Sequence, residues 1–443
     1  MTKPAIFLVE DIIDGHPVTL YEKITWKLYQ HIRQQKKETF WLSEIPRLLA
    51  SYKTAIEFVT VKDFIREVSM SGMPKDRDVY YFIVCRHFLD LSNIEDFLLI
   101  DYRVLDFLAN NHIPIILDTS AEQNNHYKEA HRLAEQKTWL YDRPEFEILK
   151  KLEFIVVGST IIPHEVNQVT SLNFKFTFFP SGFFFYNYQG GPYNQDLIEN
   201  RQLVIDRINN KQITQDTYIW ESWQYTPRWF RIAFQLKAEH LNLTGRIGRY
   251  SRLNPGRERM MQFFNNDWFK SLRYHKFLSF LTKDILATAD EIKILDNAIP
   301  WPMNNNKLSL ITKESDSMFF VASESYEPLI YEEIANTKSN LTDKCSLRIT
   351  SGQAFIPMGG QHLGSILKDL GFREFKHLEW PTQPLLYDEM DYILDRIKFI
   401  AGLSLEQRQD LYEEWKENLI HNFNHYIDID VPAAYLDSIR RAV

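Results

Sequence analysis

A short stretch in the second half of the chain has residue types that suit the binding of a phosphate group. Thr342, Asp343 and Lys344 open a helical pattern, in which the threonine can cap the helix and the aspartate suits the dipole of its first turn. A cation is not favoured by the dipole in that turn. Lys344 is better explained if it meets an anion that the amino terminus of the helix also holds.

Residues on either side of this helix start could complete a pocket for a sugar ring. Glu324 follows the apolar run 318–323, and its carboxylate could accept hydrogen bonds from two ribose hydroxyl groups. Gly359 and Gly360 follow the next apolar run, 354–358, where glycine lets the backbone approach a ligand or turn tightly into a helix. We therefore predict that one pocket binds a phosphate and a sugar.

This segment resembles the donor-binding portion of fucosyltransferase-like glycosyltransferases, including phage-encoded members. In that family a Glu-Ser pair precedes a loop, a Thr-Glu-Lys run, a helix and a strand that leads into glycine. Asp343 stands where the family has glutamate, which shortens the reach of the carboxylate by one methylene group. The resemblance assigns donor binding to Glu324, Ser325, Thr342, Asp343, Lys344, Gly359 and Gly360, and the run at 368–372 matches a further family stretch.

An arginine-rich stretch supports this resemblance. The sequence at 245–264 resembles the Asn-Arg-x-x-Arg-x-x-Arg region that opens the second domain of the phage relatives. Between 245 and 276, eight basic residues face two acidic ones, so this stretch is locally positive in a chain of net charge −8. Arginine binds diphosphates through two parallel hydrogen bonds and can stabilise a leaving diphosphate without a metal ion. Arg252 and Arg259 are the first candidates, with Arg257 between them.

Sugar transfer with inversion, which the resemblance implies, also needs a base that takes the proton of the acceptor. Asp118 ends the apolar run 113–118, and Glu122 follows four residues later. We predict these two carboxylates as the catalytic candidates. The pair Glu10 and Asp11 occupies the equivalent place after the first apolar run, and the sequence does not choose among them.

The elements that must position these residues alternate between strand-like and helical patterns. Nearly continuous apolar runs separated by amphipathic stretches are typical of βαβ units with a parallel sheet, in which ligands gather at the carboxyl ends of the strands. The expected strands are 5–10, 56–61, 79–85, 113–118, 154–158, 174–179, 307–312, 318–323 and 354–358. The expected helices are 20–35, 94–110, 121–135, 342–351, 361–370, 387–401 and 405–421.

These patterns predict an α/β protein with two Rossmann-like, doubly wound domains that face a central cleft, the GT-B architecture implied by the resemblance. The aromatic set Trp220, Trp223, Tyr225, Trp229 and Phe230 is expected to be packing core rather than a stacking platform for a ligand. The expected parts are an acceptor-side domain at 1–180, an aromatic-rich connector or insertion at 181–244, a nucleotide-sugar-binding domain at 245–403 and a helical tail at 404–443.

Composition narrows the classes of protein that fit. The 443 residues are 44% hydrophobic and 25% charged, which excludes a collagen-like or largely disordered chain. The net charge of −8 argues against binding to DNA through bulk positive charge. Two cysteines, Cys85 and Cys345, exclude a disulfide framework and a four-cysteine zinc site. We expect no metal site, no signal peptide and no membrane span, and hence a cytoplasmic protein, in the host cytoplasm if a phage encodes it.

The predicted function is that of a metal-independent glycosyltransferase that moves a sugar from a nucleotide-sugar to a hydroxyl acceptor. The resemblance to phage enzymes favours a modified base in phage DNA as the acceptor, and no cofactor is expected besides the donor. A glycan or surface polysaccharide is the alternative acceptor, which the acidity of the chain favours. A non-catalytic module that binds a nucleotide or a carbohydrate is the competing class, which Asp343 favours. Dinucleotide-binding and P-loop glycine motifs do not occur in the sequence.

Overall fold

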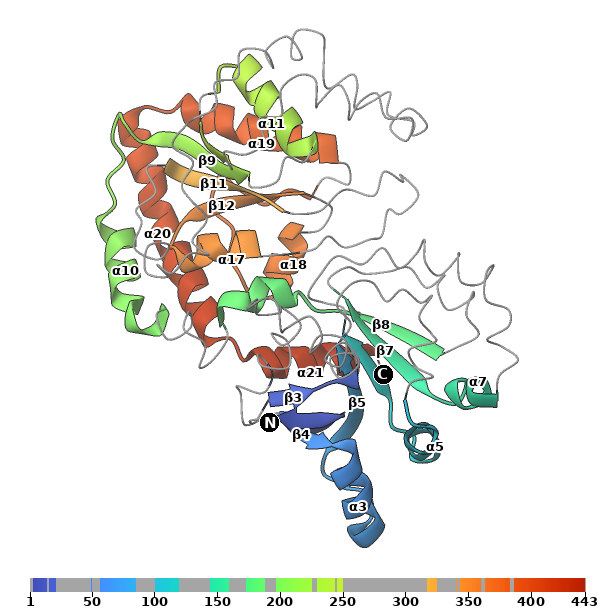
Figure 1. Ribbon diagram of the computed structural model, residues 1–443. Coiled ribbons are helices and arrows are strands. Elements are labelled where there is room, and N and C mark those ends of the chain that lie inside the picture. The colour runs from blue at the N-terminus through green and yellow to red at the C-terminus, as the bar shows by residue number, and fades with distance from the viewer. Residues whose placement is uncertain are drawn as a thin grey trace, which may run out of the picture. The chain divides into compact units, whose positions relative to one another are not determined.

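A computed structural model gives the fold of the protein, and its helices and strands are labelled as in Figure 1. The structure describes residues 3–13, 16–20, 49, 56–84, 100–118, 144–158, 173–187, 197–224, 229–243, 245–249, 317–324, 341, 343–359, 363–382 and 386–442. Among the expected elements, the strand at 307–312 and the helices at 20–35 and 121–135 lie almost wholly outside these residues.

The chain divides into two compact units. The first contains residues 1–191 together with 430–443, and the second contains 192–429. The chain therefore passes between the units twice. These divisions differ from the expected boundaries after 180, 244 and 403, because the supposed connector supplies a strand to the second sheet and the supposed tail ends in a helix on the first.

A parallel sheet forms the centre of the first unit. Within the described part of this unit, six strands occur in the order β4-β1-β5-β6-β7-β8, and all neighbouring pairs are parallel. β1 therefore lies between β4 and β5, which are the next two strands of this sheet along the chain, as in doubly wound sheets. The prediction of an α/β fold is confirmed. The strands are β1 (Ala5–Val9), β4 (Ile56–Thr60), β5 (Asp78–Val84), β6 (Ile115–Asp118), β7 (Glu153–Gly158) and β8 (Asn173–Phe178), and a hairpin of β2 (Asp11–Ile13) and β3 (His16–Val18) follows β1.

Helices cover both faces of this sheet. On one face three helices pack on apolar side chains that include Leu8 and Tyr81. On the other face the last helix places Tyr435 against Phe7 and Phe179, with ring centroids 6.3 and 4.9 Å apart. The first face carries α3 (Val61–Ser71), α5 (Tyr102–Asn110) and α7 (Pro144–Leu149), and the second carries α21 (Val431–Ala442).

The last helix belongs to the first unit because its apolar side and its polar side both find partners there. Leu436 and Ile439 are fully buried. The carbonyl oxygen of Ser438 accepts a hydrogen bond of 2.7 Å from the hydroxyl of Thr177 on β8. Arg440 forms an ion pair of 2.9 Å with Asp78 at the start of β5. A segment that the sequence presents as a tail is therefore part of a domain core.

The second unit is built on a shorter sheet with the same kind of strand order. In the described residues of this unit, four parallel strands occur in the order β10-β9-β11-β12. Here too the first strand along the chain, β9, lies between the next two, β10 and β11. The strands are β9 (Tyr218–Gln224), β10 (Arg246–Arg249), β11 (Ser317–Ser323) and β12 (Ala354–Met358).

Helices lie on both faces of this second sheet as well (Figure 1). On one face the indole of Trp220 packs edge-on against Phe234, with ring centroids 5.6 Å apart. On the other face the guanidinium of Arg348 stacks on the Phe320 ring at 3.5 Å. The first face carries α11 (Trp229–His240) and the second carries α17 (Asp343–Thr350), with α18 (Leu363–Asp369) and α19 (Leu386–Ala401) following β12.

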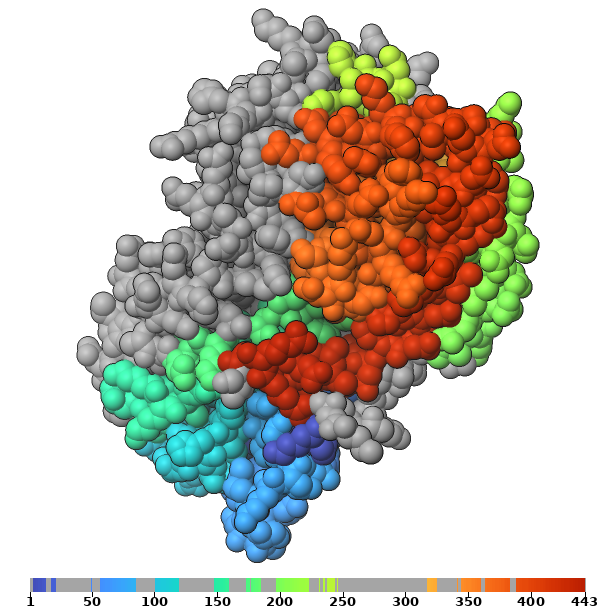
Figure 2. Space-filling model, turned by 180° about the vertical axis from the view of Figure 1, so that it is seen from behind, coloured from blue at the N-terminus to red at the C-terminus, as the bar shows by residue number. Residues whose placement is uncertain are grey.

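Two further helices of the second unit lie side by side on its outer surface, as Figure 2 shows from behind. These are α10 (Arg201–Asn210) and α20 (Leu405–Asp428). Their ends are joined by an ion pair between Arg201 and Asp428. Polar side chains of α20 also hold the segment after α18, since Asn422 accepts from the backbone N–H of Arg373 at 2.7 Å and donates to its carbonyl oxygen at 2.7 Å.

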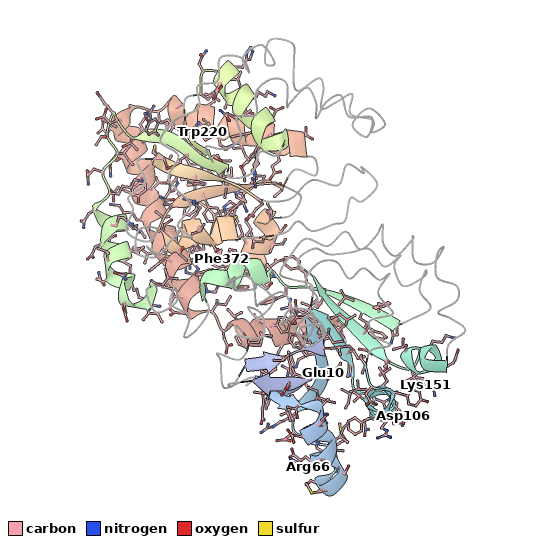
Figure 3. All side chains as sticks on the ribbon, viewed as in Figure 1. Glu10, Arg66, Asp106, Lys151, Trp220 and Phe372 are labelled. Atoms are coloured by element: carbon pink, nitrogen blue, oxygen red, sulfur yellow. The ribbon has the colours of Figure 1, made fainter. Side chains whose placement is uncertain are left out.

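The strand β9 is the largest difference from the predicted organisation. Trp220 is buried in the core of the second unit, as expected of the aromatic set, and Figure 3 labels it on β9. Its indole N–H donates to the carbonyl oxygen of Leu243 at 3.2 Å. A side chain at Gly245 would overlap the indole, so a glycine is required there. The sequence did not mark this stretch as a strand, because Glu221 and Ser222 interrupt its apolar pattern.

Candidate functional site

The strand order of the second unit points to the edge where β9 and β11 end. In doubly wound sheets, ligands bind at the carboxyl ends of the two strands between which the order reverses. These strands are β9 and β11, because the chain moves to β10 on one side and to β12 on the other. Ser323 ends β11, and Glu324 follows it directly.

Glu324 connects three elements at this edge. Its side chain is fully buried. Its backbone N–H donates to the carbonyl oxygen of Met358 at the end of β12, at 2.7 Å. Its Oε1 atom accepts a hydrogen bond of 3.3 Å from the backbone N–H of Cys345 in the first turn of α17. A carboxylate that accepts from the amino end of a helix stabilises that end, so Glu324 fixes where α17 begins.

The first turn of α17 carries Lys344, which is half-buried. The next residue, Cys345, is fully buried, and burial together with the Glu324 carboxylate raises the pKa of its thiol well above the ordinary value. The positive charges of Lys344 and Arg348 act in the opposite direction without reversing the shift. Cys345 is therefore a protonated core thiol. The cation beside it occupies the position from which the sequence predicted phosphate binding.

Gly359 ends β12 against Glu324. Its φ of 138° is disfavoured for residues with a side chain, and a Cβ there would lie 3.2 Å from the Cβ of Glu324. Its backbone N–H donates to both carboxylate oxygens of Glu389, at 3.3 and 3.4 Å. Glu389 is buried in the first turn of α19. The glycine thus allows two strands and two helix starts to meet closely.

A buried arginine from α11 fixes the same edge from the other face of the sheet. Arg231 is 1% exposed, and one of its terminal nitrogens donates to the carbonyl oxygens of Ser323 and Glu324 at 2.8 and 2.7 Å. The hydroxyl of Ser222 on β9 donates to the carbonyl oxygen of Val321 at 3.0 Å. The ends of β9 and β11 are therefore tied together by polar side chains rather than by apolar packing alone.

The structure places some of the predicted site residues close to one another. The structure brings together Glu324, the helix start that carries Lys344, and Gly359. It describes Asp343 only as the first residue of α17, with no position for its side chain. Arg231, Ser222 and Glu389 were missed. The signal for the first two was the pair of polar residues within the strand-like run 218–224, whereas Glu389 looks like an ordinary acidic residue at a helix start.

The predicted carboxylates of the first unit have different surroundings. Asp118, at the end of β6, is fully buried, and its Oδ2 atom accepts a hydrogen bond of 2.5 Å from the hydroxyl of Tyr435 on α21. Burial and the Asp118 charge raise the pKa of Tyr435 well above the ordinary value. Glu10, at the end of β1, accepts a hydrogen bond of 2.5 Å from the hydroxyl of Tyr81 and is half-buried.

Seven predicted site residues lie outside the residues that the structure describes. They are Glu122, Arg252, Arg257, Arg259, Ser325, Thr342 and Gly360. Among the described side chains, no group of three or more His, Cys, Asp or Glu residues is arranged to hold a metal ion. In the same part of the chain, no helix has both the length and the apolar character needed to cross a bilayer.

The two sites suit different chemistry. The edge of the second sheet presents a helix amino terminus with a lysine in its first turn, which suits a phosphate. The edge of the first sheet presents carboxylates bonded to tyrosine hydroxyls, which suit proton transfer or the binding of hydroxyl groups. Comparison of the chain with models of known protein families and with curated proteins finds no match.

Proposed function

We propose that the protein is a glycosyltransferase of the two-domain GT-B type, which moves a sugar from a nucleotide-sugar to a hydroxyl group. The observation that carries the proposal is the hydrogen bond from the first turn of α17 to Glu324, beside the close contact of Glu324 with Gly359. It fixes a helix amino terminus at the edge of a parallel sheet where topology expects a ligand. In the proposal the second unit binds the donor and the first unit binds the acceptor.

The donor diphosphate is held in this proposal by the backbone N–H groups of the first turn of α17 and by Lys344. A phosphate there can accept from N–H groups of the first turn other than that of Cys345, which donates to Glu324, and the lysine charge compensates the anion. Arg252, Arg257 and Arg259 would complete the neutralisation of the leaving diphosphate, so that the reaction needs no metal ion. Glu324 acts first by fixing the helix start, and its contact with the ribose, like that of Asp343, remains a prediction from the resemblance.

The acceptor in the proposal is a hydroxylated or otherwise modified base in phage DNA. Its support is the resemblance to phage enzymes and the locally positive stretch at 245–276. The alternative acceptor is a glycan or surface polysaccharide. A salt series of duplex DNA binding separates the two, because contacts to phosphate weaken steeply as salt rises. No binding of duplex DNA at low salt would remove DNA as the acceptor.

The donor site is tested by thermal unfolding with a panel of UDP, GDP, ADP and CDP. A nucleoside diphosphate at 100 times its dissociation constant stabilises the folded state by about 2.7 kcal/mol. We expect one member of the panel to raise the melting temperature of the wild type, and Lys344→Ala to abolish that rise. Lys398→Ala, an exposed lysine on α19, is the matched control and should keep it.

The same experiment extends to turnover. Nucleotide-sugars are then tested that carry the nucleoside diphosphate with the largest stabilising effect. The wild type should release the free nucleoside diphosphate from one of them, and Lys344→Ala should not. If no nucleoside diphosphate stabilises the wild type, or if Lys344→Ala binds and turns over like the wild type, the proposed function is wrong.

A second candidate is a module that binds a nucleotide or a carbohydrate without catalysis. One observation favours it: the carboxylate of Asp118, a predicted catalytic group, is fully buried and bonded to Tyr435. Stabilisation by a nucleoside diphosphate without release from any nucleotide-sugar would support this candidate.

A further inference from the structure

Arg231 is a buried cation beside the candidate donor site, but it comes from the opposite face of the sheet. Neighbouring residues of a strand point to opposite faces. Phe319 of β11 is paired in register with Trp220 of β9, on which α11 packs, whereas α17 packs on the ring of Phe320. The helix that carries Arg231 and the helix that carries the predicted phosphate site therefore cover different faces, as Figure 1 shows for α11 and α17.

The guanidinium of Arg231 holds the backbone at the end of β11. One of its terminal nitrogens donates to the carbonyl oxygens of Ser323 and Glu324, at 2.8 and 2.7 Å. All three residues are buried. Hydrogen bonds from a charged donor are stronger than those between neutral groups. Two of them on consecutive carbonyl groups fix the direction in which the chain leaves the strand.

The same part of the backbone determines where the Glu324 side chain lies. The N–H of Glu324 donates to the carbonyl oxygen of Met358 at 2.7 Å, so both polar groups of its backbone are bonded. Its carboxylate accepts from the backbone N–H of Cys345 in the first turn of α17, at 3.3 Å. The position of that turn therefore depends on a series of hydrogen bonds that begins at Arg231.

Arg207 provides a contrast at the other end of α17. It donates to the carbonyl oxygen of Ser351, the residue that follows the last one of this helix, at 2.9 Å. Both arginines bond to backbone carbonyl groups of the same unit. Arg231 does so next to the carboxylate that caps the first turn of α17, and Arg207 does so beyond the last turn.

We propose that Arg231 is a positioning residue of the donor site, which sets the place of the first turn of α17 through Glu324. This inference rests on the donor site of the proposed function. Arg231 is 1% exposed, and its role is to hold Glu324 rather than to bind the diphosphate. When the arginine is replaced by an apolar residue, two buried carbonyl groups lose its N–H, the end of β11 relaxes, and the first turn of α17 shifts with it.

The first test measures affinity rather than melting temperature, because loss of a buried charged group also lowers stability. The full chain is titrated by equilibrium dialysis with UDP, GDP, ADP and CDP, at a temperature at which every variant is folded. For the nucleoside diphosphate that the wild type binds most tightly, we expect Arg231→Met to weaken binding about 10-fold. Arg207→Met is the matched control and should bind like the wild type, although it also removes a bond to a backbone carbonyl group.

A variant that keeps the charge covers the case in which Arg231→Met does not fold. Arg231→Lys leaves a cation in the core, but the shorter side chain cannot reach both carbonyl oxygens. Its affinity for the same nucleoside diphosphate should therefore also fall below that of the wild type.

Hydrogen exchange distinguishes positioning of the helix start from a general loss of structure. Arg231→Met, or Arg231→Lys in its place, should speed exchange of the Cys345 amide, which donates to Glu324, and leave the last turn of α17 protected. Arg207→Met should leave the Cys345 amide protected.

The outcomes separate this inference from the proposed function. Wild-type affinity in the folded Arg231 variant, or unchanged exchange of the Cys345 amide, overturns this inference alone. Failure of all four nucleoside diphosphates to bind the wild type overturns the proposed function. The exchange measurement needs no nucleotide, so it still tests whether Arg231 sets the start of α17.

Discussion

The two sheets begin with the same strand order, but they carry their buried polar groups at different places. In the second unit, Ser222, Arg231 and Glu324 gather at the carboxyl ends of β9 and β11. In the first unit, β1 is apolar along its whole length, and the cations that pair with Asp78 lie at the amino edge. At its carboxyl edge stand two carboxylates, Glu10 and Asp118, each bonded to a tyrosine hydroxyl.

This difference separates the location of a site from its chemistry. Strand order alone selects the same edge in both units. The side chains then decide what could bind there, because a helix start with a lysine suits an anion and a carboxylate bonded to a tyrosine hydroxyl suits a hydroxyl donor. The comparison also predicts that the two units respond separately to substitution.

The largest expected effect is the loss of the aromatic anchor of α21. Tyr435→Ala should destabilise the first unit by about 3–5 kcal/mol, because it empties a buried aromatic site and removes the hydroxyl that Asp118 accepts from. Hydrogen exchange should show loss of protection in β5, β6 and β7 and little change in β9 and β11.

The matched substitution in the second unit is Tyr426→Ala, a fully buried tyrosine of α20, which should produce the opposite pattern. Equal loss of protection in both sheets for either variant would mean that the units do not unfold separately.

A smaller effect is expected where β12 meets Glu324. Gly359→Ala should cost about 1–3 kcal/mol, because the residue has a φ of 138° and a Cβ would press on Glu324. Nucleoside diphosphate binding should weaken with it, since the start of α17 depends on Glu324. Gly402→Ala is the control, because a Cβ there meets only ordinary contacts, at 3.4 Å and beyond. Unchanged melting and binding in Gly359→Ala would contradict the close packing described for this edge.

The first unit should also be more sensitive to alkaline conditions through its tyrosines. Burial and the charge of Asp78 raise the pKa of Tyr80 to about 12, from an ordinary value of 10.0. Since the folded-state pKa is raised, the stability contributed by neutral Tyr80 is complete below pH 10 and is lost as the pH rises toward 12. Tyr80→Phe should reduce this loss in the first unit and leave the second unchanged, as followed by hydrogen exchange and phenolate absorbance. An identical alkaline profile for the variant would exclude this role of Tyr80.

The smallest effect is expected at the amino edge of the first sheet. Arg440→Gln should cost about 0.2–1 kcal/mol, because its ion pair with Asp78 is partly exposed. Burial alone would raise the pKa of Asp78, but the hydrogen bonds and charges of Lys3 and Arg440 lower it overall. The stability from this pair is therefore present above pH 3.8 and lost as the pH falls and Asp78 is protonated. Denaturant unfolding at pH 7 and at low pH measures it, and a difference that persists in acid would contradict the assignment.

The fold was largely predictable where strands are covered on both faces. Such strands read as continuous apolar runs, and the runs at 5–10, 56–61 and 354–358 each contain an observed strand. β9 was not predicted as a strand because it contains the buried polar residues Glu221 and Ser222. Hydrogen bonds to the neighbouring strand β11 satisfy both side chains, and an apolar pattern does not reveal such bonds. The place of α21 was also hidden, since its partners Thr177 and Asp78 are far away in the sequence.

The candidate site was predictable only where its residues follow a strand or open a helix. Glu324, Lys344 and Gly359 stand at such positions, which is why the sequence singles them out as candidates. Arg231 donates hydrogen bonds to backbone carbonyl groups at the end of β11. Every residue type has a backbone carbonyl group, so the sequence contains no partner residue that would point to this role. The same holds for Glu389, which binds the backbone N–H of Gly359.

The return of the chain to the first unit has a consequence for its synthesis. During translation, β1 to β8 leave the ribosome before any part of the second unit, whereas α21 follows only after all of it. Phe7 and Phe179 of the first unit therefore lack their contact with Tyr435 of α21 until the second unit has been synthesised. An expression fragment ending at 191 would therefore lack the helix whose Tyr435 packs against Phe7 and Phe179.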